Sequence, residues 1–342
     1  MKLRSLAVLL LLSCATAAAA PARPRTEYEI LRAIPAERLR ALMGDVPDAQ
    51  GFIGTNHRAG RWLEAGTQRG SSRAVIVGVV TDDFAYADNA WRGIDATFAR
   101  QRADGGFEAS DRPNGTSAKP FPAAIQTAFF FMQELGRAIL VIRESPHEAH
   151  FHARIAELEP KMRRAMAFIT SGHDTIIAGS SKAVNRIFIA AKAFGLCGLV
   201  LHDEALVATS RRLVTHALTL RDQDGVFIEH GGRDSSYNVV SILFGQVLAL
   251  HLSLPELETA LPAAVAWELT RIGPRGEVDV TGNTRTGVGL EPSYFGDPKT
   301  VNYGEVVQAL TLYGLIHHDD ACLAAAEKVF AYRAAMDKKA AQ

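Results

Sequence analysis

The alternation of short and long connections between apolar helical segments is the sequence feature that most constrains the fold. Apolar residues recur at helical spacing along most of the 342 residues, and strand-like alternation is scarce. The short connections each carry a polar residue or a proline that suits a helix start, and they lie at 144–147, 202–203, 254–255 and 318–319. The long connections are polar and rich in glycine, and they lie at about 44–70, 103–120, 171–181, 222–234 and 273–301.

This spacing predicts an all-α chain. The predicted helices cover residues 27–43, 71–81, 83–102, 121–143, 148–170, 182–200, 203–221, 235–253, 256–272, 302–316 and 319–337. The segment 73–80 is rich in Val and Ile and would also suit a strand. Consecutive connections of antiparallel helix pairs fall at opposite ends, so we expect every long connection at one end of the molecule and every short one at the other.

A glycine-containing motif recurs within the long connections. It reads Asp-Gly-Gly-Phe-Glu at 104–108, Asp-Gly-Val-Phe-Ile-Glu at 224–229 and Arg-Gly-Glu-Val-Asp at 275–279. The hairpins repeat about every fifty to sixty residues. This repeat indicates an (α/α)5–6 toroid, which is an incomplete barrel of helical hairpins, in one domain at 21–342. Helices after long connections are apolar nearly all round, which favours an inner ring. An open solenoid and a plain helical bundle with long loops are the alternatives.

The N-terminus predicts export. Lys2 and Arg4 precede an apolar run at 6–12, and small residues follow at 17–20, as in a secretory signal peptide at 1–20. The run is too short to span a bilayer. We therefore expect a periplasmic or secreted protein, and a lipoprotein attached through Cys14 is the alternative.

The charge balance and the motifs present narrow the classes of partner. The chain has 37 Lys plus Arg and 37 Asp plus Glu, so its net charge gives no electrostatic attraction for a polyanion, and we expect no nucleic-acid partner. We also expect no membrane span and a monomer. Histidines at 147, 150, 152 and 317–318 lie beside short connections, away from the expected cleft. Nucleotide, serine-hydrolase and zincin motifs are absent from the sequence, and we predict no metal site and no cofactor.

Polar residues on the long connections are the candidates for chemistry, because the long connections of a toroid would build a cleft. The richest stretch is 224–238. In it, Asp234 or Ser235 is expected to cap the next helix, and Tyr237 falls in the first turn. His230 lies between a Glu and two glycines and has little core to fill, so it is a candidate for proton transfer. Asp-Gly at 224–225 predicts a tight turn.

The stretch 224–237 resembles a loop of the α/α-toroid polysaccharide lyases, a group that includes the chondroitin, hyaluronate, xanthan and alginate lyases. The shared features are a D-G-x-F turn, then a His, a Gly and a Ser-Ser-Tyr that opens a helix. The resemblance implies β-elimination in an acidic polysaccharide, with His230 and Tyr237 in proton transfer and Asn185 neutralising the uronate carboxylate. The Asn-Asn-Trp-Trp and Asn-Asn-His-Ser-Tyr-Trp signatures of these lyases are absent, although Asn56 and His57 form a fragment of the second.

The predicted elimination reaction requires positively charged or amide side chains close to the substrate carboxylate. Removing a proton next to a carboxylate needs amides or cations that stabilise the enolate-like transition state, and a tyrosine needs nearby cations to become a phenolate. Arg233 or Arg285 could provide this support in catalysis. The expected substrate-binding residues are Asn56, His57, Arg186, Asn238, Arg285, Lys299 and Tyr303.

Two alternatives use other side chains. A toroid glycoside hydrolase would need two facing carboxylates, and the candidates are Asp104, Glu108, Asp224, Glu229 and Asp234. A non-catalytic carbohydrate-binding toroid would need aromatic platforms, and the candidates are Trp62, Trp91, Phe107, Phe227 and Tyr294.

Overall fold

The computed structural model describes residues 25–111, 113, 120–293 and 295–340, and all regular secondary structure in this part of the chain is helical. The elements are α1 (Glu27–Arg32), α2 (Ala36–Met43), α3 (Gly54–Ala59), η1 (Ala65–Gln68), α4 (Arg69–Val80), α5 (Phe84–Phe98), α6 (Pro120–Glu144), α7 (Glu148–Ser171), α8 (His173–Ser180), α9 (Val184–Leu201), α10 (Glu204–Leu218), α11 (Ser235–His251), α12 (Pro255–Thr270), α13 (Tyr303–His317) and α14 (Asp320–Ala340). The all-α prediction is confirmed, and the strand alternative for 73–80 is wrong. The predicted signal peptide, with Cys14, lies outside the described residues.

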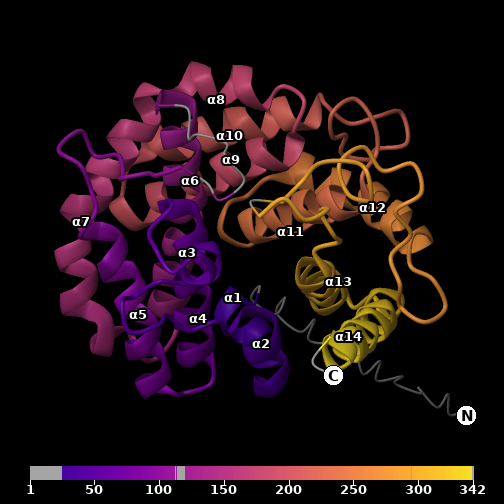
Figure 1. The fold of residues 1–342 in the computed structure, drawn as a ribbon, viewed down its shortest axis with the longest axis horizontal. Helices are drawn as coiled ribbons and strands as arrows, with labels where there is room; N and C mark the ends of the chain where they lie inside the picture. Colours follow the sequence, from indigo (N-terminus) through magenta and orange to yellow (C-terminus); the bar gives the residue numbers. More distant parts are fainter. Residues whose placement is uncertain (1–24, 112, 114–119, 294, 341–342) are drawn as a thin grey trace, which may run out of the picture.

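Most of the helices pack as consecutive hairpins. The pairs in contact are α4 with α5, α6 with α7, α9 with α10, α11 with α12 and α13 with α14. The first helix of each pair also packs against the first helix of the next, so that α4, α6, α9, α11 and α13 form a continuous series. Figure 1 shows the hairpins following one another in chain order. Both α1 and α2 contact α13 and α4, the last and first helices of this series.

The helices of this series carry most of the core. In α9 and α11 nearly every residue is buried, whereas α7 and α10 bury one face and expose the other. Burying each large apolar side chain contributes about 1.5–3 kcal/mol, so these central helices dominate the stability. The segments Ala124–Glu144 and Val184–Leu201 are long and apolar enough to cross a membrane, but they are 83% and 89% buried inside the molecule.

Contacts join the long connections to one another. These contacts link Arg61 with Asp111, Ala183 with Glu229, Glu229 with Thr284, and Arg58 with Asp297. A separate set of contacts lies near the short connections, and it links Asp82 with His147, Arg143 with Val200, and Arg211 of α10 with Ser253. The contacts among the long connections agree with the predicted grouping of those connections, whereas none of the contacts named here joins two of the four predicted short connections.

The recurring glycine motif forms the same tight turn three times. Gly105, Gly225 and Gly276 have φ angles of 89°, 83° and 92°, a backbone region that glycine adopts at little cost. A Cβ on Gly105 would lie 2.2 Å from a carbonyl oxygen of α7, and one on Gly276 would lie 2.1 Å from a carbonyl oxygen of α14. The motif is therefore structural, as predicted for 224–225, and it brings each turn close to a neighbouring outer helix.

Three helix predictions need correction. The predicted helix 27–43 is broken into α1 and α2, because Pro35 lacks the N–H of a continuing helix and its ring clashes with the preceding turn. The connection predicted at 171–181 is largely the helix α8, and the one at 44–70 contains α3 and η1. These elements are too short to show the repeated spacing by which sequence patterns reveal a helix.

A buried network of charges, which the sequence pattern did not indicate, ties four helices together. Arg137 Nε donates to Glu27 Oε1 at 2.7 Å, and Lys192 Nζ donates to Glu134 Oε1 at 3.0 Å. His251 Nε2 lies 2.9 Å from Glu27 Oε2. Burial opposes ionisation of Glu27, but Arg137 and His251 lower its pKa to about 2. Buried charges are tolerated only when paired, so this network depends on each of its members.

Candidate functional site

Asp234 brings two distant segments together at the start of α11. Its carboxylate caps the helix by accepting the backbone N–H groups of Ser236 at 3.1 Å and Tyr237 at 3.2 Å. The same carboxylate accepts the backbone N–H groups of Arg285 and Thr286, each at 2.8 Å. Asp234 is completely buried. The last long connection is therefore fixed against α11, and Arg285 is held beside Tyr237.

Cations surround the ring of Tyr237. The guanidinium carbon of Arg285 lies 3.9 Å from the ring centroid, and Lys299 Nζ lies 5.6 Å from it. Arg186, at the start of α9, is close enough for its charge to interact with both Tyr237 and Arg285. Arg285 and Lys299 therefore lie against Tyr237 as cation–π partners.

Glu291 neutralises two of these cations. Its carboxylate accepts from Arg285 Nε and Nη2, each at 3.1 Å, and also pairs with Lys299. Burial works against ionisation, but Arg285 and Lys299 lower the pKa of Glu291 to about 2. Arg186 is different, because it makes no ion pair with any described residue, and burial together with the charge of Arg285 lowers its pKa. Arg186 is therefore the cation in this cluster left to bind an external anion.

His230 belongs to the same cluster. Its Nδ1 lies 3.4 Å from Glu291 Oε1, and the side chain is 39% exposed. Burial, followed by the charges of Arg285, Arg186 and Lys299, lowers the pKa of His230. The imidazole is thus neutral at pH 7 and can accept a proton. His230 and Tyr237 therefore share the charged neighbours Arg285 and Lys299.

Asn185 lies on the buried side of the cluster. Its backbone N–H donates to Glu229 Oε1 at 3.0 Å, and the other oxygen of Glu229 accepts from Arg285 at 2.9 Å. Burial raises the pKa of Glu229 to about 7 despite Arg285. The side-chain oxygen of Asn185 is buried without a hydrogen-bond partner among the described residues. This oxygen is a hydrogen-bond acceptor, so it can serve an N–H or O–H group but not a carboxylate.

Arg233 and Asn238 make structural contacts of their own. Arg233 Nε pairs with Asp222 at 2.5 Å, and its Nη2 pairs with Asp224. The two aspartates of the tight turn therefore neutralise the charge of Arg233. Asn238 is completely buried and donates to Glu268 Oε2 at 3.0 Å. Of the two arginines predicted to support catalysis, Arg285 is the one that contacts Tyr237.

The remaining predicted binding residues have other partners. Asn56 is completely buried and accepts the backbone N–H of Leu63 at 2.8 Å, which folds the first long connection. His57 is exposed and lies 2.9 Å from Asp48. The ring of Tyr303 packs against that of Tyr332, with centroids 5.6 Å apart. None of the contacts described for these side chains reaches Tyr237.

The carboxylates proposed for hydrolysis are mostly engaged elsewhere. Asp234 and Glu229 are completely buried and hydrogen-bonded as described above. Asp104 accepts from Arg102 at 2.8 Å and from the backbone N–H of Gly106 at 2.9 Å, and Asp224 pairs with Arg233. Glu108 is exposed.

The proposed aromatic platforms also lie mainly in the interior. Phe107 and Phe227 are completely buried, and Trp91 is 2% exposed. Trp62 is partly exposed, but Arg100 lies 4.8 Å above its ring and its Nε1 donates to the carbonyl of Glu108. Tyr294 lies outside the described residues.

Glu229 and Glu291 were not predicted as members of the Tyr237 cluster. Glu229 follows the tight turn and Glu291 lies in the long connection, and neither position shows any regular spacing from Tyr237 in the sequence. The charge pairing with Arg285 became visible only once both connections were placed side by side.

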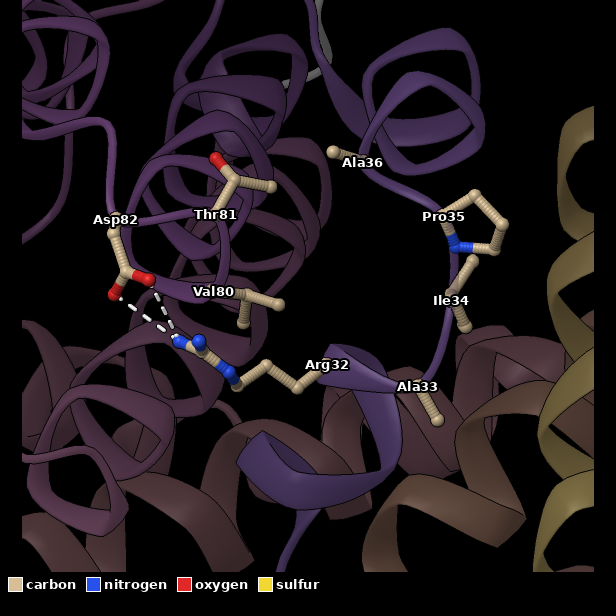
Figure 2. Close-up of a pocket in the computed structure, with 8 residues that line it drawn as sticks. All are labelled: Arg32, Ala33, Ile34, Pro35, Ala36, Val80, Thr81 and Asp82. Carbon is tan, nitrogen blue, oxygen red and sulfur yellow. Dashed lines mark hydrogen bonds and ion pairs between the residues drawn. The ribbon is translucent and has the colours of Figure 1, made fainter.

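The two best-defined pockets lie away from this cluster. One is lined by residues 32–36 and 80–82, and Figure 2 shows Arg32 beside Asp82 within it, 2.9 Å apart. The other lies between α7 and α10. Neither pocket is lined by Tyr237 or by the charged residues around it. Within the described residues no group of His, Cys, Asp and Glu could hold a metal ion.

A scan against models of protein families found no match, and a search of curated proteins found none.

Proposed function

We propose that this protein is an exported polysaccharide lyase that cleaves a uronic-acid polymer by β-elimination. The observation that carries the proposal is the placement of Tyr237 among Arg285, Lys299 and Arg186, with a neutral histidine in the same cluster. An elimination needs a proton acceptor, a proton donor and a group that neutralises the substrate carboxylate. This cluster contains side chains suited to all three tasks.

In the proposed reaction, the guanidinium of Arg186 and the side-chain NH2 of Asn185 donate hydrogen bonds to the uronate carboxylate. The proton on the carbon next to that carboxylate passes to the Tyr237 and His230 pair, and the electron pair of the C–H bond becomes the new carbon–carbon double bond. The bond to the leaving sugar oxygen breaks, and that oxygen takes up a proton from the same pair. Arg285 and Lys299 lie against the ring of Tyr237 and position it for these steps. The reaction needs no cofactor.

We further propose that the helix series closes into an α/α toroid. The support is that α1 and α2 contact both the first and the last helices of the series, α4 and α13. An open solenoid would leave these helices apart.

The hydrolase is supported less well, because four of its five candidate carboxylates are already paired or buried. A binding module is supported less well too, because three of its five candidate platforms belong to the core.

The proposal is tested by incubating the protein with a panel of acidic polysaccharides while the ultraviolet absorbance of the new double bond is followed. Tyr237→Phe should abolish the absorbance and keep the fold, because only the phenol oxygen is removed. Tyr303→Phe is the matched control and should retain activity. New reducing ends without absorbance would indicate hydrolysis, and an active Tyr237→Phe variant would refute the assignment of this residue.

A further inference from the structure

Part of the last long connection reaches across the end of the molecule where the long connections meet. Residues 283–293 and 295–301, called the strap below, form two arms joined by a hydrogen bond from Gly287 N to Lys299 O at 3.1 Å. The base of the strap is fixed to α11 through Asp234. Its arms also carry the cations that lie against the ring of Tyr237. The strap therefore covers one side of the proposed site.

The far end of the strap is fastened to α3. Arg58 Nη2 pairs with Asp297 Oδ2 at 3.1 Å, and the guanidinium carbon of Arg58 lies 3.9 Å from the ring centroid of Phe295. We call these three side chains the clasp. Since α3 packs on η1 and η1 packs on α6, the strap runs from α11 to the part of the helix series that contains α6. Figure 1 shows this light orange segment passing over α11 towards α3.

We propose that the clasp selects which part of a polymer reaches Tyr237. A chain end or a short chain can pass beneath a strap that is fastened at both ends. An internal stretch continues in both directions and can be laid into the site only after one end of the strap has opened. The protein is therefore expected to act on chain ends and oligosaccharides. This inference rests on the proposed function, because it concerns access to the same site.

The clasp is suited to open as well as to close. The side chains of Arg58 and Asp297 are 61% and 62% exposed. Ion pairs this exposed are weak and are screened further by salt. The base of the strap is held by a completely buried carboxylate. Opening is thus expected at the clasp, while the residues around Tyr237 stay in place.

The test compares Arg58→Ala with Arg61→Ala. Both arginines are exposed and lie on the same connection, but Arg61 donates to Ser110 and to the carbonyl of Asp111 and does not hold the strap. The measured quantity is the loss of viscosity of a long uronate polymer for each double bond formed. Arg58→Ala should raise this ratio several-fold, because internal bonds become accessible, whereas Arg61→Ala should leave it at the wild-type value. Cleavage of short oligosaccharides should be equal in all three proteins.

A second measurement needs no substrate. Hydrogen exchange at the amides of Ser293 and Gly296, which donate to Asp297 O and Ser293 O beside the clasp, should be faster in Arg58→Ala than in wild type and unchanged in Arg61→Ala. Unchanged exchange in Arg58→Ala would overturn the clasp itself. Faster exchange with an unchanged viscosity ratio would overturn its role in access. If no polymer yields double bonds with the wild-type protein, the proposed function fails, and the exchange result still decides whether the clasp holds the strap.

Discussion

Replacing Glu268 by Gln should stabilise the protein above pH 5. Glu268 lies in α12, is completely buried and accepts a hydrogen bond from Asn238 at 3.0 Å, while its other oxygen has no partner among the described residues. Burial raises its pKa from 4.5 to about 8. Glutamine keeps the oxygen that Asn238 needs and has no charge to bury. The substitution therefore isolates the effect of ionisation.

The direction of this pH dependence follows from the protonation of Glu268 in the folded and the unfolded protein. The folded protein holds a proton on Glu268 that the unfolded chain releases above pH 4.5, so unfolding becomes easier as the pH rises from about 4.5 to about 8. Each pH unit in this window costs about 1.4 kcal/mol, which amounts to about 3 kcal/mol at pH 7. Glu268→Gln removes this cost and should be more stable than wild type by an amount of that order at pH 7, and equal to wild type near pH 4.

Urea unfolding between pH 4 and pH 9 measures this difference directly. Glu258→Gln is the matched control, because it changes an exposed glutamate of the same helix and should not alter the pH dependence. The comparison of variant with wild type also cancels the other titrating groups, including the buried charges around Arg137. If the difference in unfolding free energy between Glu268→Gln and wild type were the same at pH 4 and pH 8, the argument from burial would be refuted.

Two further predictions concern stability. Glu27→Gln should destabilise the protein by about 3–5 kcal/mol in urea unfolding, because it removes the buried negative charge that pairs with Arg137 and His251; a loss below about 1 kcal/mol would show that the pairs contribute little. Gly276→Ala should lower the melting temperature much more than Gly282→Ala. Both glycines have positive φ, but only a Cβ on Gly276 meets a backbone oxygen; equal losses would show that backbone strain alone decides the effect.

Connection lengths predicted the architecture because they report geometry that local propensity does not. A two-residue connection forces adjacent helices into a hairpin, and a longer one allows crossing to the next hairpin. The break at Pro35 could have been read from the sequence, since proline ends a helix for steric reasons. The helix α8 could not, because eight residues without a clear polar face give no pattern to detect.

The candidate site was predictable only in part. Tyr237 could be placed from the cap before it, because Asp or Ser followed by an apolar run marks a helix start. Choosing Arg285 over Arg233 was not possible from the sequence, since both stand on long polar connections. The choice depends on where the carboxylates lie. Asp222 and Asp224 take up the charge of Arg233, and contacts across the chain decide this.

Asp234 shows why function and fold are hard to separate in this chain. As an N-cap it satisfies two backbone donors of α11, a role that the sequence predicts. Its second oxygen accepts the backbone donors of Arg285 and Thr286, some fifty residues away, a role that no local pattern predicts. Because one carboxylate both caps α11 and anchors the strap, it fixes Tyr237 and Arg285 next to each other. The residue that places Tyr237 beside Arg285 is thus completely buried.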